Sequence, residues 1–340
     1  MAHTIVKPEV IVKAAAEALE SKLVVPAVFQ REGIDKYRGA KDDTVNITVE
    51  GVLPYRTYGW RNDRSTELVF DEYTERKVPM AFGDDIYNGV KLTDEQNEMD
   101  LHGWAKLAGK QTDAIRVGLE YKATQAVLSA PFEVQVQLDK ADLRGSLIKL
   151  RQVMTKLKAP GARSILVDDD LETALLADKD LNLASNVGEA EAVSALREAT
   201  LGRRYGFDFV KAEELPSGES VAMVDGGFIF LTAAPSVPQS VGFGASASVN
   251  GIALRWIRDF DLKHLQDMSV FNAYQGFQHV KDPLRYVDAT GQAKVSTTEH
   301  FVRAVKVTLG TGYKVEVGNS EISTITGLIS TDGLNDGVMA

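Results

Sequence analysis

Residues 93 to 129 decide the fold, and they read TDEQNEMDLHGWAKLAGKQTDAIRVGLEYKATQAVLS. The first four residues have the form of a capping box, in which Thr93 and Gln96 satisfy each other's unpaired backbone N–H groups. Apolar residues then recur mostly at helical spacing until Pro131 closes the run. These apolar residues are Leu101, Trp104, Ala105, Ala108, Ile115, Leu119, Ala126 and Val127. The spacing predicts a helix over 93–129, which would be roughly 55 Å long.

Such a helix is longer than the ~30 Å diameter of a small domain, so it would lie along the outside of the molecule. Gly103, Gly109 and Gly118 each lower its stability by about 1 kcal/mol relative to Ala. They leave flat places where another backbone can approach, and a break in the helix would fall near one of them.

The composition is that of a globular protein with an acidic surface. The chain has 340 residues and a formal net charge of −10, enough length for two domains or one elaborated domain. An acidic chain disfavours nucleic-acid binding over its whole surface, although a local basic face remains allowed. The chain contains no cysteine, shows no secretory signal and has no window near the ~20 apolar residues of a membrane helix. We therefore expect a soluble protein made in a cytosol.

The first 43 residues have the pattern of an N-terminal arm. Pro8 suits the first turn of a helix, the residues after it favour helix, and Pro26 ends the run. The arm precedes anything that resembles a core. It packs either on its own chain or on a neighbouring copy, and the sequence leaves both open.

Residues 44–82 change to a period of two. Val45, Ile47 and Val49 alternate with polar residues, and Leu68, Phe70 and Val78 mark a return strand. The pattern predicts a long two-stranded excursion whose tip, residues 55–65, reads YRTYGWRNDRS. Because an isolated hairpin of that size is marginal in water, it needs another surface to lie against.

Helices and strands mix over residues 133–250, which indicates an α+β layer. Predicted strands are 133–138, 164–167, 207–210, 221–224 and 228–231. One predicted helix follows Asp139, which is its N-cap. Two further helices are predicted over 169–177 and 189–200. Beyond them, Asn250-Gly251 predicts a hairpin turn. Further strands are expected at 252–260, 270–271, 276–280, 301–309 and 313–317. The tail from Asn319 is expected to be loosely held.

No catalytic, cofactor or metal site emerges from the motifs. Residues 242–247, GFGASA, match a dinucleotide fingerprint in letters, but two prolines precede them and Asn250-Gly251 prevents a following helix, so we expect a flexible loop. Asp168-Asp169-Asp170 fits the acidic start of a helix better than a metal cluster. His264, near Asp261 and Asp267, fits a solvated loop better than an acid–base group.

The tip of the excursion carries Tyr58, Trp60, Arg61 and Arg64. Aromatic residues interleaved with arginines bind single-stranded nucleic acid, and the same residue types dominate protein–protein contacts. Acidic residues flank the tip, namely Glu67, Asp71, Glu72 and Glu75. Since these carboxylates repel a polyanion, we predict a subunit contact.

The predicted parts follow one another as an N-terminal arm, a long extended hairpin, a long helix, an α+β module and a closing set of strands. Two stretches add sequence detail to this order: residues 162–176, where ARSILVD leads into a helix, and residues 201–228, where LGRRYGFDFV precedes MVDGGF. This arrangement resembles the major capsid proteins of tailed phages with the Hong Kong 97-type fold. The resemblance is nearest to the subgroup of the phage P22 coat protein and similar actinophage proteins. It implies an α+β fold divided into an N-terminal arm (1–43), an extended β-hairpin loop (44–90), a spine helix with a peripheral-domain strand (91–139), an axial domain (140–250), and peripheral-domain strands with a C-terminal tail (251–340).

The resemblance implies a coat protein, not an enzyme, that assembles into hexamers and pentamers of an icosahedral shell around double-stranded DNA. The implied partners are other copies of the chain, a scaffolding protein, a portal and possible decoration proteins, with no membrane and no cofactor. The implied location is the virion capsid, assembled in the cytoplasm of a bacterial host.

Some family members cross-link through a loop lysine. The tip here has none, because Lys77 and Lys91 lie beyond it, so we expect no cross-linking. The alternatives are an encapsulin-type compartment of the same fold and a metal-dependent enzyme that uses Asp168–Asp170.

Overall fold

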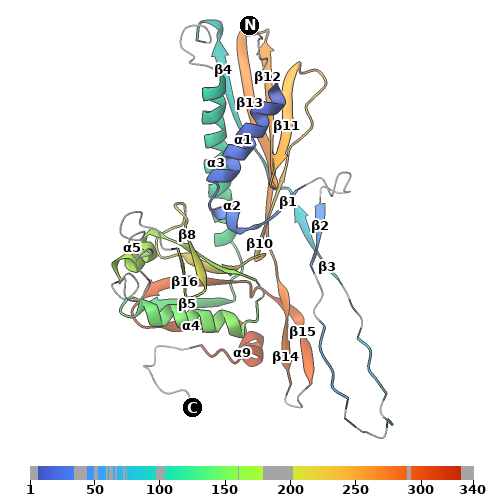
Figure 1. Cartoon of the computed structure of the whole chain (residues 1–340), viewed down its shortest axis with the longest axis vertical. Helices are drawn as coiled ribbons and strands as arrows, with labels where there is room; N and C mark the ends of the chain where they lie inside the picture. The colour runs from blue at the N-terminus through green and yellow to red at the C-terminus, as the bar shows by residue number, and fades with distance from the viewer. Residues whose placement is uncertain are drawn as a thin grey trace. The chain divides into compact units, whose positions relative to one another are not determined.

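The computed structural model describes residues 7–33, 44–49, 53–58, 60, 64–65, 67–71, 73, 75–96, 104–159, 161–178, 202–288 and 292–330. The chain forms two compact units (Figure 1). Unit 1 comprises residues 1–46, 79–129 and 228–278, and unit 2 comprises residues 47–78, 130–227 and 279–340. No described helix is long and apolar enough to cross a membrane.

Unit 1 is built on a six-stranded sheet in the order β1-β10-β13-β12-β11, with β4 also paired to β13. The strands are β1 (Gln30–Gly33), β4 (Asp84–Thr93), β10 (Phe228–Ala233), β11 (Phe243–Val249), β12 (Ile252–Asp261) and β13 (Gln266–His279). Asn250 and Gly251 have φ of 49° and 79°, as the predicted hairpin turn between β11 and β12 requires. The flexible loop predicted over 242–247 is wrong, because β11 pairs along its whole length with β12.

The spine helix α3 spans Trp104–Leu128. Asp94 and Glu95 are also helical, directly after Thr93, where the sequence predicted the helix to begin. The capping box itself forms, since the Gln96 N–H donates to Thr93 Oγ1 at 3.4 Å and the Thr93 N–H donates to Gln96 Oε1 at 3.3 Å. Strand β4 occupies the chain up to Thr93 because it pairs with β13. Residues 97–103 lie outside the described residues.

A buried amide fastens α3 to the sheet. Gln111, 2% exposed, donates through Nε2 to the backbone oxygens of Asn88 and Ser269 at 3.2 and 3.0 Å. Its Oε1 accepts from Ser269 Oγ at 2.7 Å, and Trp256 Nε1 donates to the same hydroxyl at 2.9 Å. One side chain therefore links α3 to β4 and β13 and, through Ser269, to β12.

The described part of the N-terminal arm packs on its own chain. Helix α1 (Pro8–Lys22) buries Val12, Ala16 and Leu19, and helix α2 (Val25–Val28) follows it. Glu120 on α3 is only 6% exposed and accepts hydrogen bonds from the backbone N–H groups of Val24 and Val25. Of the two alternatives that the sequence left open, packing on the same chain therefore holds for these helices.

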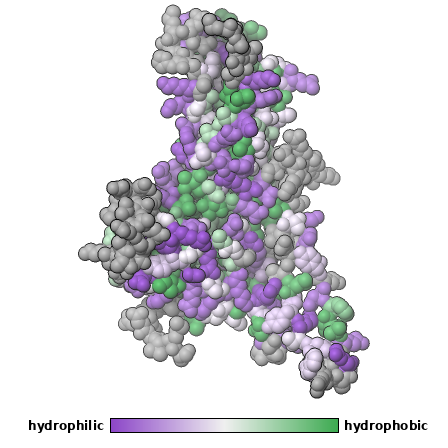
Figure 2. Space-filling view, viewed as in Figure 1, coloured by the Kyte–Doolittle hydropathy of each residue, from purple (hydrophilic) through white to green (hydrophobic). Residues whose placement is uncertain are grey.

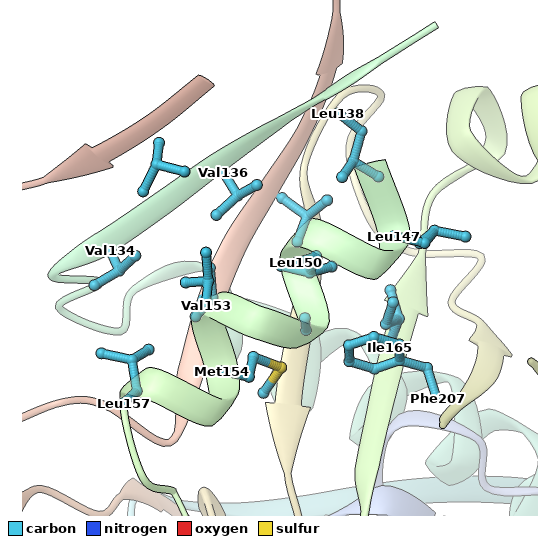
Figure 3. Packing of buried hydrophobic residues seen from close by; sticks show 14 of the residues in the cluster. Val134, Val136, Leu138, Leu147, Leu150, Val153, Met154, Leu157, Ile165 and Phe207 are labelled. Atoms are coloured by element: carbon cyan, nitrogen blue, oxygen red, sulfur yellow. The ribbon is translucent and has the colours of Figure 1, made fainter. Parts of the chain in front are cut away.

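Unit 2 is built on a seven-stranded sheet in the order β17-β5-β16-β9-β6-β8-β7. The strands are β5 (Val134–Asp139), β6 (Arg163–Val167), β7 (Arg203–Arg204), β8 (Phe207–Lys211), β9 (Ser220–Val224), β16 (Ala304–Gly310) and β17 (Lys314–Val317). Helix α4 (Leu143–Lys156) lays Leu147, Leu150 and Met154 over this sheet, where β5, β6 and β8 supply the facing apolar side chains (Figure 3).

The local signals for α5 (Asp169–Ala177) are confirmed residue for residue, whereas the cap of α4 is not the predicted one. The N-cap of α4 is Asp142, whose Oδ1 accepts from the Gly145 N–H at 2.8 Å. Asp139 instead ends β5 and accepts from the backbone N–H groups of Ala141 and Gly312. The helix predicted over 189–200 lies outside the described residues.

The sequence analysis did not predict a hairpin and a helix of unit 2. Strands β14 (Asp282–Val287) and β15 (Ala293–His300) form a separate antiparallel hairpin. Helix α9 (Ser320–Thr326) occupies the tail that was expected to be loose, with Asn319 as its N-cap and Ile322 fully buried. Ile322 belongs to the same core as α4, and this burial holds the tail in place.

Among the described residues of the excursion at 44–82, strand pairing is confined to its base, between β2 (Thr44–Val49) and β3 (Arg76–Ala81). Of the predicted return strand, Val78 lies in β3, but Leu68 and Phe70 lie in no strand. That part of the prediction is wrong because no partner strand is aligned with them.

Replacing Gln111 by Leu tests the fastening of α3. The change leaves the buried oxygens of Asn88 and Ser269 without their donor, so we expect the free energy of unfolding to fall by about 1–3 kcal/mol. Urea denaturation measures it. The matched control is Gln125→Leu at an exposed position of the same helix, expected to change stability by less than about 0.5 kcal/mol. Equal losses in the two variants would contradict the role given to Gln111.

Candidate subunit-contact surface

The extended segment between β2 and β3, residues 53–75, exposes large apolar side chains along both of its legs. Phe70 is 88% exposed and Trp60 is 90% exposed, while Leu68 and Val69 are more than half exposed. Figure 2 shows hydrophobic residues, coloured green, on the surface of this segment. Three adjacent apolar side chains that are all exposed have no buried side, so the segment has surface to offer another molecule.

An ion pair joins the two legs of the segment. Arg56 donates through Nε and Nη2 to the two carboxylate oxygens of Asp71, at 3.0 and 2.5 Å. The hydrogen bonds from the guanidinium lower the pKa of Asp71, and the same bonds raise the pKa of Arg56. A bidentate pair of this kind fixes the geometry of both residues. The apolar residues beside it are therefore presented in one register.

A small hollow of about 190 Å³ lies between the legs. Its lining residues are Tyr55, Arg56, Thr57, Tyr58, Glu67, Leu68, Val69 and Gln292. Gln292 comes from the connection between β14 and β15, so this connection lies beside the loop within unit 2.

The structure places the predicted contact residues differently from one another. The Arg64 guanidinium lies over the Tyr58 ring, 5.2 Å from its centre, and Arg64 has a left-handed φ of 58°. Trp60 stands apart from them and is exposed. Arg61 lies outside the described residues. The role of Tyr58, Trp60, Arg61 and Arg64 in a subunit contact stays a prediction.

Leu68, Val69 and Phe70 were not predicted as contact residues. The sequence interpretation assigned Leu68 and Phe70 to a return strand. Their signal was the run of three apolar residues between Glu67 and Asp71, because an amphipathic strand would place a polar residue at position 69.

The three consecutive aspartates do not gather around a point. Asp168 is 2% exposed, and its carboxylate accepts from the N–H groups of Leu171 and Gly218 and from Ser220 Oγ. Asp169 and Glu172 both pair with Lys211. No metal-binding cluster occurs among the described residues, and the helix-start interpretation accounts for these contacts.

His264 lies on the turn between β12 and β13. Its Nδ1 is 2.7 Å from Asp261 Oδ2, and its side chain is 64% exposed. Asp267 pairs with Arg258 on the neighbouring strand at 3.1 Å. The arrangement is a solvated turn, as expected.

A protein-family model described as phage capsid protein matches residues 86–281, more than half of the chain. The chain belongs to the phage capsid protein family. No curated protein sequence matches it.

Solved capsid structures share the fold of this capsid protein. The chain from Mycobacterium phage Che8 is 12% identical with a TM-score of 0.54, covering 84% of this chain and 91% of that one. The capsid of cyanophage P-SCSP1u is 10% identical with a TM-score of 0.55, covering 84% and 87%. The mature capsid of bacteriophage PhiM1 is 11% identical with a TM-score of 0.51, covering 85% and 87%.

The capsid protein has the Hong Kong 97-type α+β fold that the sequence predicted. It is a phage major capsid protein of an icosahedral shell, located in the virion capsid, and self-assembly with other copies is its function. The family consists of structural proteins, so the prediction that the chain is not an enzyme is also confirmed.

Asp71→Asn tests the ion pair of the loop. The amide loses the charge that holds Arg56, so we expect faster cleavage of the 53–75 segment in limited proteolysis with no change in the thermal unfolding of the two units. Because the pKa of Asp71 is lowered, the pairing is present at neutral pH and is lost as the pH falls through that lowered pKa. The wild-type segment should therefore become equally sensitive only in strong acid.

Glu67→Gln is the matched control, since Glu67 is exposed on the same leg and has no ion pair among the described residues. Its cleavage rate should equal that of the wild type. A D71N variant that is cut no faster than E67Q would remove the clamp from the description of the loop.

Proposed function

We propose that this capsid protein forms hexamers and pentamers of a shell that encloses double-stranded DNA, and that the 53–75 segment contacts the adjacent subunit. The observation that carries the contact is the exposure of Leu68, Val69 and Phe70 on a segment that its own sheets leave uncovered. Burying each such side chain contributes about 1.5–3 kcal/mol. A neighbouring copy in a closed ring offers that burial at every subunit.

Tyr58, Trp60, Arg61 and Arg64 are the residues that we propose as the centre of the contact. Trp, Tyr and Arg combine a large apolar area with a polar group, and they are enriched among the residues that dominate binding energy. The stacking of Arg64 on Tyr58 supports the proposal because it holds both side chains in place before a partner arrives.

The regions of the chain receive roles in this proposal. Residues 1–43 act as the arm, 44–90 as the extended loop, 91–139 as the spine with its strand, 140–250 as the axial domain, and 251–340 as peripheral strands and tail. The spine tilts or bends as the shell matures. A scaffolding protein, a portal and possible decoration proteins take part in assembly.

Two finer proposals concern relatives and chemistry. We place the chain with the phage P22 coat protein and similar actinophage proteins. A shell structure at atomic resolution would test this by superposition on the P22 coat protein and on the actinophage proteins.

We also propose that mature shells are not cross-linked, because the tip lacks lysine. Denaturing electrophoresis of mature particles should give a single band at 37.1 kDa.

Replacing Trp60 and Arg61 by Ala tests the loop contact. We expect assembly to be blocked or strongly reduced while the subunit keeps its circular dichroism and thermal unfolding, because the exposed Trp60 has little to lose within its own chain. Negative-stain microscopy and sedimentation measure the particles. Phe70→Ser should have the same effect through the other leg.

Tyr87→Ala is the matched control, as Tyr87 is an exposed aromatic residue on β4, outside the 53–75 segment. Normal particles from both loop variants would refute the proposed contact. Expression of the wild type alone separates a phage coat from an encapsulin, since an encapsulin closes into a small shell of fixed size without scaffold.

A further inference from the structure

The two parallel strands β6 and β8 give the sheet of unit 2 two chemically different ends. Arg163 at the start of β6 pairs in register with Phe207 at the start of β8, and Val167 pairs with Lys211 at their ends. The four steps of ~3.3 Å between the first and last residues of each strand separate the ends by roughly 13 Å. Basic side chains gather at the amino end, and acidic side chains gather at the carboxyl end.

The basic end brings arginines together without acidic partners. Arg163 Nη1 donates to the backbone oxygen of Arg151 at 3.3 Å, and Nη2 donates to Thr155 Oγ1 at 3.0 Å. The Arg151 guanidinium lies against the turn at Gly206, where a Cβ would be 3.3 Å from Cζ. Neither Arg151 nor Arg163 has an ion pair among the described residues, and burial together with the charge of Arg151 lowers the pKa of Arg163.

Arg203 adds a third cation to this end. Its Nε is 3.6 Å from Asp208 Oδ1, which is a loose ion pair. Arg203 precedes the turn at Gly206, against which the Arg151 guanidinium lies. Asp225, at the end of the neighbouring β9, is the other carboxylate close by, and it lies against Gly161. The arginines therefore outnumber their carboxylate partners, and the like charges repel one another until a partner carboxylate arrives.

At the carboxyl ends of β6 and β8, carboxylates outnumber the cations in the part of the chain that the structure describes. Strand β6 runs into the acidic first turn of α5, and the Ala212 N–H donates to the Val167 oxygen at 3.1 Å, which brings the following residues to the same place. Lys211 neutralises part of the charge through Asp169 and Glu172. The remaining carboxylates, exposed and without an ion pair among the described residues, are Asp170, Glu213 and Glu214.

We infer that the basic end of this sheet, centred on Arg151, Arg163 and Arg203, binds the acidic end of the same sheet in a second copy, with Asp170, Glu213 and Glu214 as its partners. Two different, complementary faces on one molecule make a head-to-tail contact, and such contacts close into rings when the rotation between copies allows it. The inference rests on the proposed function, in which copies form hexameric and pentameric rings.

A nucleic acid is the competing occupant of the basic end. The chain as a whole carries a net charge of −10, and the exposed carboxylates of the acidic end lie on the same sheet. A duplex that reached the arginines would be repelled by these carboxylates, whereas a second copy brings the complementary charge in a compact form.

Charge reversal with restoration is the test. R151E/R203E makes both ends acidic, D170K/E213K makes both ends basic, and the chain with all four changes exchanges the ends at an unchanged net charge of −10. We expect each two-site variant to lower the particle yield at least about tenfold, because like charges then face one another across the contact. The four-site chain should recover most of the wild-type yield.

Controls separate this inference from folding and from the proposed function. Thermal unfolding of each variant must match the wild type, and Arg163→Gln provides a second, uncharged probe of the basic end if R151E/R203E fails that criterion. K106E/K110E, with the same change of net charge at exposed positions of α3 in unit 1, should assemble normally.

Three outcomes would overturn the inference. The first is a two-site variant that assembles at wild-type yield, and the second is a four-site chain that stays as defective as its two-site parents. R151E/R203E shells that form normally but retain less DNA would show that the basic end faces nucleic acid instead. A folded wild type that never forms rings or shells, with its scaffold present, would refute the proposed function itself.

Discussion

The fold of unit 1 depends on how a 25-residue helix is held against a sheet whose strands come from distant parts of the chain. Apolar packing supplies most of the energy, but packing alone lets a helix slide along a sheet. Gln111 removes that freedom, because its amide has three partners at fixed positions on β4 and β13 and each would be left unsatisfied by a shift. Glu120 fixes the arm in the same way at the other end of the helix.

Unlike unit 1, the 53–75 segment has neither a sheet nor a core of its own among its described residues. Among its described residues, the exposed ion pair of Arg56 with Asp71 joins the two legs, while the large apolar side chains face solvent. An exposed ion pair contributes little to stability, so its use is in geometry rather than in energy. In the proposed function, the exposed apolar side chains of the segment become buried against an adjacent copy. A capsid protein needs that division, since the subunit must fold before it assembles.

Unit 2 separates its tasks differently. Its core, formed by α4 over β5, β6 and β8, is apolar and closed, and its charges lie at the two ends of the strands (Figure 3). Asp168 shows how little of this charge is available for chemistry, since its carboxylate is consumed by capping α5 and by Ser220. The charged ends therefore serve contacts between copies rather than catalysis, in keeping with a structural protein.

The sequence by itself determined the elements whose causes are local: α5 with its acidic cap, the Asn250-Gly251 turn, the capping box at Thr93, and the apolar strands β6, β8, β9 and β10. It also supported the fold family through the order of these parts. Only the tertiary structure decided that β4 continues to Thr93, that Asp142 rather than Asp139 caps α4, that α9 is buried, and that Leu68 to Phe70 are exposed. For the first three the physical reason is contact between residues far apart in the chain: β4 pairs with β13, more than 170 residues away, Asp139 accepts from the Gly312 N–H, and α9 joins the core of α4. Local propensity carries no information about contacts at that separation.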